Sequence, residues 1–304
     1  MLDRVAAPLP RLEQAMWQTA AAMDGLFAEL LALPEDPSRR LYEAMRYAAI
    51  GGGKRLRPLL VIAGGALFDV PQAQLLRAGL AVECIHVHSL IHDDLPCMDD
   101  DDLRRGRPTV HLAYDEASAV LAGDALLALA FEILSAPETH PSGGVRSDLV
   151  LELARAAGAG GMAGGQMLDL AAEAGGSLCL DSITRLQRLK TGALIAWSVM
   201  AGGILGDAPP EARASLRGYA HCLGLAFQIA DDLLDVEGEE DKAGKRLRKD
   251  AEQGKQTFVS LLGQDRARDQ AQMLADQACD HLRGFGESAD LLRAIVRFAV
   301  ERDR

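Results

Sequence analysis

Apolar residues recur at helical spacing along nearly all of this 304-residue chain, and no segment alternates apolar and polar residues as a half-buried strand does. In residues 11–33, for example, apolar side chains three, four and seven positions apart form one stripe, and Pro34 follows it. Aromatic residues, which favour strands, make up only 4% of the chain. The sequence therefore predicts an all-α fold, with further helical stretches at about 39–50, 58–68, 72–94, 116–135, 145–172, 181–205, 211–236 and 256–300, the last of them broken.

Glycine and proline clusters separate these stretches, but no linker is long or polar enough to mark a domain boundary. Hydrophobic residues make up 49% and charged residues 25% of the chain, a balance typical of a soluble globular protein. We therefore expect one domain over residues 1–304, a bundle of roughly ten helices around a common core.

Charge, hydropathy and cysteine usage exclude several classes of protein. The net charge of −12 argues against binding to a nucleic-acid backbone. The longest apolar stretch, residues 193–206, is shorter than the roughly 18 residues of a membrane span, and the first residues lack a signal-peptide pattern. The five cysteines are scattered and never form a CxxC pair, which predicts free thiols, a cytoplasmic location and no zinc framework.

Two aspartate-rich motifs follow strongly apolar stretches. The first is HDDLPCMDDDD, residues 92–102, and the second is DDLLD, residues 231–235. An exposed aspartate run is often only a solvated loop, and this interpretation remains open for Asp99–Asp102. It suits less well the carboxylates that end apolar helices, which need a cation nearby: Asp93, Asp94, Asp231 and Asp232.

The spacing within each motif predicts how its carboxylates can meet. Asp231 and Asp235 lie about 40° apart on one helix face. Asp93 and Asp99 would be about 240° apart on a continuous helix, but Pro96 disfavours helix continuation. A turn after the helix end could return Asp99 to Asp93.

All-oxygen ligands select Mg²⁺, Mn²⁺ or Ca²⁺, and neither motif has the alternating ligands and central glycine of an EF-hand. Mg²⁺ usually takes one or two carboxylates and completes its shell with water and substrate phosphates. The two motifs therefore predict a phosphate substrate, which needs cationic residues as well.

Basic residues occur in four places that suit this requirement. Three cations follow a glycine run in GGGKRLRP, residues 51–58, and LRRGRP, residues 103–108, follows the first acidic motif. Lys190 and Thr191 stand within an apolar stretch, and a basic segment from Lys245 to Lys255 follows the second motif. Any one cluster is typical of a solvated face, but two acidic motifs that are each followed by cations indicate a metal-assisted diphosphate site.

Two weaker patterns have more ordinary interpretations. Residues 158–163, GAGGMA, match a variant of the dinucleotide-binding fingerprint but follow a helical pattern, which favours close helix packing by small residues. His86, His88 and His92 form an HxHxxxH pattern, for which packing and hydrogen bonding are favoured over a metal site.

Together these segments resemble the trans-isoprenyl diphosphate synthases. The stretch from His88 to Thr109 resembles the first aspartate-rich motif of that family in its bacterial DDxxxxD form. GGKRLRP, Lys190-Thr191 and FQIA followed by DDLLD resemble the other landmarks in the family's order, so that the resemblance covers residues 40 to 262. It implies an all-α bundle around a deep central cavity, a homodimer, and prenyl transfer with about three Mg²⁺ ions, for which Mn²⁺ is a possible substitute.

The resemblance also implies roles for individual residues. Asp93 and Asp99 would bind two ions and Asp231 a third with Asp235 nearby, while Asp94 and Asp232 would support them. Isopentenyl diphosphate would be held by Lys54, Arg57, His86 and Arg105. The allylic diphosphate would be held by Arg104, Lys190, Gln228 and Lys245, with Thr191 and Lys255 assisting. Gln166 and Asp169 resemble cavity-lining positions without a definite role.

The chain departs from the family pattern at the positions that limit product length. Bacterial farnesyl diphosphate synthases typically carry an aromatic residue five positions before the first motif, where this chain has His88, followed by Ser89. The sequence favours farnesyl diphosphate as the product, with geranylgeranyl diphosphate as the alternative. A second departure is Arg248, at a position where glycine is common. Less favoured hypotheses are a non-catalytic partner subunit, a terpene cyclase and a divalent-ion buffer.

Overall fold

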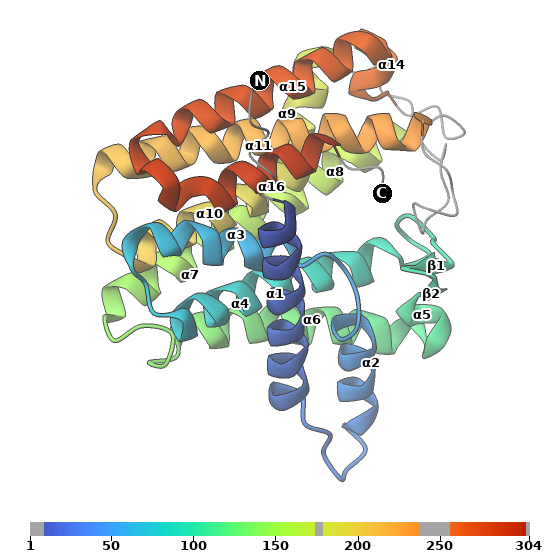
Figure 1. Ribbon diagram of the computed structural model, residues 1–304. Coiled ribbons are helices and arrows are strands. Elements are labelled where there is room, and N and C mark those ends of the chain that lie inside the picture. The colour runs from blue at the N-terminus through green and yellow to red at the C-terminus, as the bar shows by residue number, and fades with distance from the viewer. Residues whose placement is uncertain (1–8, 174–178, 238–255, 302–304) are drawn as a thin grey trace.

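The computed structural model describes residues 9–173, 179–237 and 256–301, and these residues are almost entirely helical, which confirms the all-α prediction (Figure 1). The longer helices are α1 (Leu9–Leu30), α2 (Arg39–Ala49), α3 (Leu56–Gly65), α4 (Gln72–Asp93), α6 (Glu116–Ser135), α7 (Gly143–Ala157), α8 (Met162–Glu173), α9 (Leu180–Gln187), α10 (Ala193–Leu205), α11 (Pro210–Glu237), α15 (Gln264–His281) and α16 (Asp290–Glu301). Short elements are α5 (Val110–Ala113), α14 (Phe258–Leu262), the 3₁₀ turns η1 (Ala66–Phe68) and η3 (Arg283–Ala289), and the π-helical turn η2 (Arg188–Gly192).

Three of the expected stretches are interrupted, and for one of them, 256–300, the sequence predicted the break. The stretch 145–172 divides at Gly158–Gly161, in a turn with no room for a side chain at Gly161, where a Cβ atom would lie 2.1 Å from the Ala156 carbonyl oxygen. The stretch 181–205 contains the π-turn η2, and 256–300 divides into α14, α15 and α16 with η3 between the last two.

A small hairpin is the one departure from an all-helical chain within the described residues. Strand β1 (Leu103–Arg104) pairs antiparallel with β2 (Arg107–Pro108). The two residues between them, Arg105 and Gly106, have φ angles of 55° and 74°. Two left-handed central residues are the requirement of a type I′ hairpin turn, whose twist matches that of the paired strands.

The helices bury two hydrophobic clusters that meet at α3 and α10. One cluster lies among α1, α2, α4, α6 and α7, and the other among α3, α10, α11, α15 and α16. Helix α4 packs along α6 and α11 along α15, while α10 lies against both α3 and α11. In Figure 1 the group of α11, α15 and α16 lies above the pair α4 and α6, and α1 runs down the front.

Helix α6 is long and apolar enough to cross a membrane by length and composition, although the sequence analysis expected no such segment. It packs against α4, and 39% of its most apolar window is buried in the molecule. A core helix passes the same test, so this feature is weak evidence for a span. All five cysteines carry free thiols, as the sequence predicts.

Candidate active site

Helix α4 carries the centre of the candidate site. His86 and Asp93 are seven residues apart, so they lie on nearly the same face of the helix about 10 Å from each other along its axis. Basic side chains gather around His86, and carboxylates around Asp93.

The first acidic motif folds back on the end of α4, as the position of Pro96 predicts. The backbone N–H of Asp99 donates to the carbonyl oxygen of Asp93 at 2.8 Å, and that of Asp100 donates to Leu95 at 3.2 Å. The turn therefore brings Asp99 back to Asp93.

Asp94 points to a different partner. Its Oδ1 atom accepts hydrogen bonds from Nε and Nη2 of Arg104 at 3.0 and 2.5 Å, and the same guanidinium reaches Asp101 at 3.3 Å. Because the Asp94 carboxylate is 4% exposed and already neutralised, its evident role is to fix Arg104 beside Asp93.

The Asp93 carboxyl lies in a partly buried setting of mixed charge. Burial raises its pKa to about 6; Lys190 opposes this shift, and the neighbouring Asp99 reinforces it. Among residues 9–173, 179–237 and 256–301, no three His, Cys, Asp or Glu side chains converge to enclose an ion by themselves. Two like-charged carboxylates in a partly buried site nevertheless fit Mg²⁺, which needs only one or two from the protein when phosphates supply the rest.

The basic group around His86 comes from three segments. Burial lowers the pKa of Arg57, with Glu83 opposing the shift and Arg105 adding to it. Burial, Arg57 and Arg105 together hold the pKa of His86 well below 6.5, so this imidazole is neutral at pH 7. The predicted Arg57, His86 and Arg105 therefore meet, and a neutral His86 can donate one hydrogen bond without adding charge.

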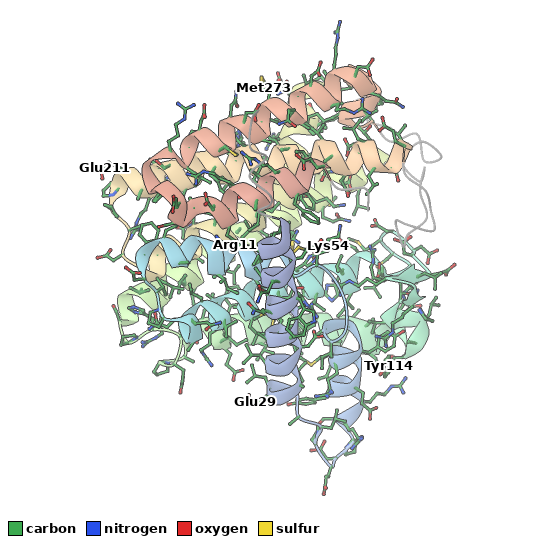
Figure 2. The ribbon with its side chains drawn as sticks, in the orientation of Figure 1. Arg11, Glu29, Lys54, Tyr114, Glu211 and Met273 are labelled. Carbon is green, nitrogen blue, oxygen red and sulfur yellow. The ribbon has the colours of Figure 1, made fainter. Side chains whose placement is uncertain are left out.

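The glycine run before α3 makes room for this group. Cβ atoms on Gly52 and Gly53 would lie 2.8 and 2.5 Å from atoms of the Arg105 side chain, which lies across the loop. Lys54 also contacts α16, where its Nζ atom lies 5.5 Å from the ring centroid of Phe298. Figure 2 labels Lys54 beside the upper end of α1.

Sequence reasoning missed a buried ion network beneath this loop. Arg55 is 2% exposed, and its guanidinium donates to Glu83 at 2.7 Å and to Asp24 at 2.8 Å. The second oxygen of Glu83 and the Nε atom of Arg57 are both buried without a hydrogen-bond partner in the described part of the chain. The signal that could have found the network is Glu83 itself, a lone acid in the apolar stretch LAVECIHV.

The π-turn η2 connects the first acidic motif with the second. Lys190 Nζ donates to Asp169 Oδ2 of α8 at 2.5 Å and also acts on the pKa of Asp93. The next residue, Thr191, donates to Gln228 at 3.3 Å, and Gln228 donates to Asp232 at 2.9 Å. A π-turn of this kind frequently marks a functional site.

The second and last residues of the second motif, Asp232 and Asp235, are buried more deeply than its first, Asp231. Asp232 is 4% exposed and accepts the backbone N–H of Phe258 at 2.9 Å through its other oxygen, so that it joins α11 to the start of α14. Asp235 is 7% exposed, one turn beyond the half-buried Asp231. Lys245, Arg248 and Lys255 lie outside the described residues.

The histidines of the HxHxxxH pattern join α4 to α6. His88 Nδ1 lies 3.1 Å from the carbonyl oxygen of Gly123, and His92 Nε2 lies 3.1 Å from that of Val120. Burial and the neighbouring His92 lower the pKa of His88 to about 4. The Ser89 hydroxyl donates to the His86 carbonyl within α4. These contacts agree with the packing interpretation.

A pocket opens beside the basic group around His86, between α2, α4 and the hairpin. Its polar wall holds the Asp94–Arg104 pair with Arg105 and Arg107, and its apolar wall is formed by Tyr47, Ile50, Val87, Leu90, Ile91 and Val110. Arg107 lies 3.9 Å from the ring centroid of Tyr47, and Tyr47 meets Tyr114 edge to face at the position labelled in Figure 2.

Known proteins resemble this chain over most of its length. The polyprenyl synthetase family model matches residues 38–295. Farnesyl diphosphate synthase of Escherichia coli is 48% identical over 267 residues, 86% of this chain and 89% of that protein. The chloroplastic geranylgeranyl pyrophosphate synthase of Catharanthus roseus is 42% identical over 87% of this chain and 74% of its own.

Solved structures extend the likeness to the fold. An FPP/GFPP synthase from Zymomonas mobilis, solved in its apo form, has 57% identity and a TM-score of 0.89, covering 95% of this chain and 99% of that one. A geranyltransferase from Helicobacter pylori, complexed with magnesium and isoprenyl diphosphate, has 32% identity and a TM-score of 0.81, covering 98% of both chains.

Proposed function

The chain belongs to the polyprenyl synthetase family, and from this premise we propose that it is a short-chain trans-prenyltransferase. It joins isopentenyl diphosphate head to tail to dimethylallyl or geranyl diphosphate, and the product is farnesyl diphosphate. The observation that carries the proposal is the spacing on α4. A cationic group at His86 and a carboxylate group at Asp93 lie on one face about 10 Å apart, which suits two diphosphates bound side by side.

The residues of this chain divide between the two substrates. Arg57, Arg105, neutral His86 and Lys54 hold isopentenyl diphosphate. The allylic diphosphate is held by Arg104, Lys190, Thr191 and Gln228, with Lys245 and Lys255 from outside the described residues.

Asp93 and Asp99 would hold two of about three Mg²⁺ ions and Asp231 the third, with Asp235 nearby and Mn²⁺ as a possible substitute. When bound, these ions would supply positive charge to offset the charge that develops on diphosphate as the allylic C–O bond breaks. The residues of this chain hold the two diphosphates in the orientation that the condensation requires, and they exclude water from the allylic cation. The departing diphosphate then accepts the proton that the condensed product loses.

Product length is the part of the proposal with a specific alternative. A geranylgeranyl pyrophosphate synthase is 42% identical to this chain, and the Zymomonas mobilis relative is described as an FPP/GFPP synthase. His88 and Ser89 are the residues of this chain proposed to limit elongation. The hydrogen bond from His88 to α6 supports a fixed imidazole rather than a mobile one.

A homodimer and a cytoplasmic location complete the proposal. Helix α6 supports the dimer, because Val120 and Leu121 on its outer face are 40% and 56% exposed in the single chain. Five free thiols support a reducing compartment.

The first test is product analysis by mass spectrometry. The purified chain is incubated with Mg²⁺, isopentenyl diphosphate and, separately, dimethylallyl, geranyl or farnesyl diphosphate. We expect a dominant fifteen-carbon product and no extension of farnesyl diphosphate; a twenty-carbon product would favour the alternative. Asp93→Ala and Asp231→Ala should each lose most turnover with the fold intact, whereas Asp102→Ala, at an exposed aspartate of the same run, should not. No product from any starter would contradict an autonomous enzyme.

A further inference from the structure

The π-turn η2 is clamped between two helices at glycine contacts. A Cβ atom on Gly165 of α8 would lie 2.2 Å from the backbone nitrogen of Lys190, and one on Gly224 of α11 would lie 3.3 Å from Gly192. The backbones approach this closely only because both positions lack a side chain. The backbone of Lys190 is therefore fixed, and the direction of its long side chain depends on which groups its ammonium group contacts.

The ammonium group of Lys190 interacts with two carboxylates. It contacts Asp169 at 2.5 Å, and Asp169 is 3% exposed at the base of α8. It also acts electrostatically on Asp93, at the end of α4. A flexible side chain with a point charge moves readily between two such partners, so the balance between them depends on which carboxylate holds it more firmly.

We propose that Asp169 is a positioning residue, whose carboxylate holds Lys190 away from Asp93 and so leaves Asp93 open to a divalent cation. The inference rests on the proposed function, in which Asp93 binds metal and Lys190 meets the allylic diphosphate. An ammonium group on Asp93 would compete with the metal for the same oxygens. Held by Asp169, the same group stays at the edge of the site, where diphosphate can reach it.

The proposal predicts a loss of metal affinity on Asp169→Asn. The neutral amide can still accept a hydrogen bond from Lys190, but it attracts the ammonium group less strongly than the charged Asp93 does. Mn²⁺ binding, followed by electron paramagnetic resonance with saturating inorganic diphosphate as the probe, should weaken about tenfold, as is typical when a residue that orients a metal site is lost. The KM for isopentenyl diphosphate should stay within about twofold of the original value, because the arginine group lies around His86, about 10 Å along α4 from Asp93.

A double-mutant cycle distinguishes this positioning role from a role of Asp169 as a metal ligand and from a purely structural role. In a Lys190→Gln background no ammonium group competes for Asp93, so adding Asp169→Asn should leave Mn²⁺ binding unchanged. If the second substitution weakens Mn²⁺ binding equally in both backgrounds, Asp169 is itself a ligand or a purely structural residue, and the inference is overturned. Glu152→Gln, which removes an exposed ion pair with Arg155 on α7, is the matched control.

The experiment distinguishes failure of the positioning role from failure of the proposed function. If the unsubstituted protein binds no Mn²⁺ with diphosphate and forms no product, the proposed function is wrong. If it does both and the cycle shows no coupling between Asp169 and Lys190, only the positioning role is wrong. Circular dichroism of each variant checks that the helices persist.

Discussion

Arg55 and Arg57 show how differently two neighbouring cations of one motif are used. Arg55 is buried and held by Glu83 and Asp24, with a left-handed backbone (φ 48°) that ends the glycine loop. Arg57 stands two residues beyond it, with its Nε atom unpartnered among the described residues. The loop is therefore anchored by one arginine so that the next one faces the candidate diphosphate site.

The pKa of Asp93 leads to a pH prediction for the metal-free protein. Burial raises this pKa from 3.8 to about 6, so the folded chain binds the proton more tightly than the unfolded chain. The stability that this proton gives is complete below about pH 4 and is lost as the pH rises through about 6.

We expect the free energy of unfolding of the wild type to fall, relative to that of Asp93→Asn, by about 1 kcal/mol between pH 5 and 7.5. Urea denaturation with a chelator present measures the difference. Parallel pH profiles of the two proteins would show that Asp93 titrates normally.

At the scale of elements, the sequence predicts helices well and their interruptions poorly. Periodicity located α4, α6 and α11 to within a few residues, because each buries one long apolar face. The turn at Gly158–Gly161 was not predicted, since small residues are compatible with helix packing and with a helix end alike. The π-turn adds one residue to a helix without changing its apolar composition, so it appears only when its partners in α8 and α11 are known.

Sequence spacing also predicted the return of Asp99 to Asp93, because a proline three residues beyond the helix end constrains the local backbone. It could not predict that Asp94 binds Arg104 or that Asp232 holds the N–H of Phe258. Those pairings depend on segments that meet only after folding. Resemblance to a family supplied the candidate residues, and tertiary contacts distinguish their roles.

The contact between α8 and η2 gives a prediction at this scale. Gly165→Ala would place a methyl group 2.2 Å from the Lys190 nitrogen, so the π-turn must move. We expect kcat to fall by at least about tenfold, with the KM for isopentenyl diphosphate nearly unchanged and a stability loss of about 1–3 kcal/mol.

Gly160→Ala is the control for this experiment, because a Cβ atom there meets nothing within 4 Å. Steady-state kinetics and thermal denaturation compare the two variants. Equal kinetics for both would contradict a role for the α8–η2 contact in placing Lys190.

In the whole molecule, α4 is the central helix of the candidate site, because it carries both His86 and Asp93. One of its faces packs on α6 within the lower cluster, while its C-terminal half carries His86 and Asp93 toward the remaining elements of the site. The partner helix α6 buries its inner face on α4 and leaves Val120 and Leu121 outside. The same helix thus supports α4 on one side and exposes apolar side chains on the other.

This arrangement predicts that the oligomeric state depends on α6. In a symmetric dimer the same patch meets itself, so Leu121→Glu would bring two buried carboxylates toward each other across the axis and should shift the protein to monomers in light scattering after size exclusion. Met273→Glu changes a residue of similar exposure, 44%, on α15 at the opposite end of the molecule (Figure 2), and should leave the dimer intact. Because His88 and His92 bind carbonyl groups of α6, loss of the dimer should also loosen the proposed floor and broaden product length. A Leu121→Glu protein that stays dimeric would place the interface on another face.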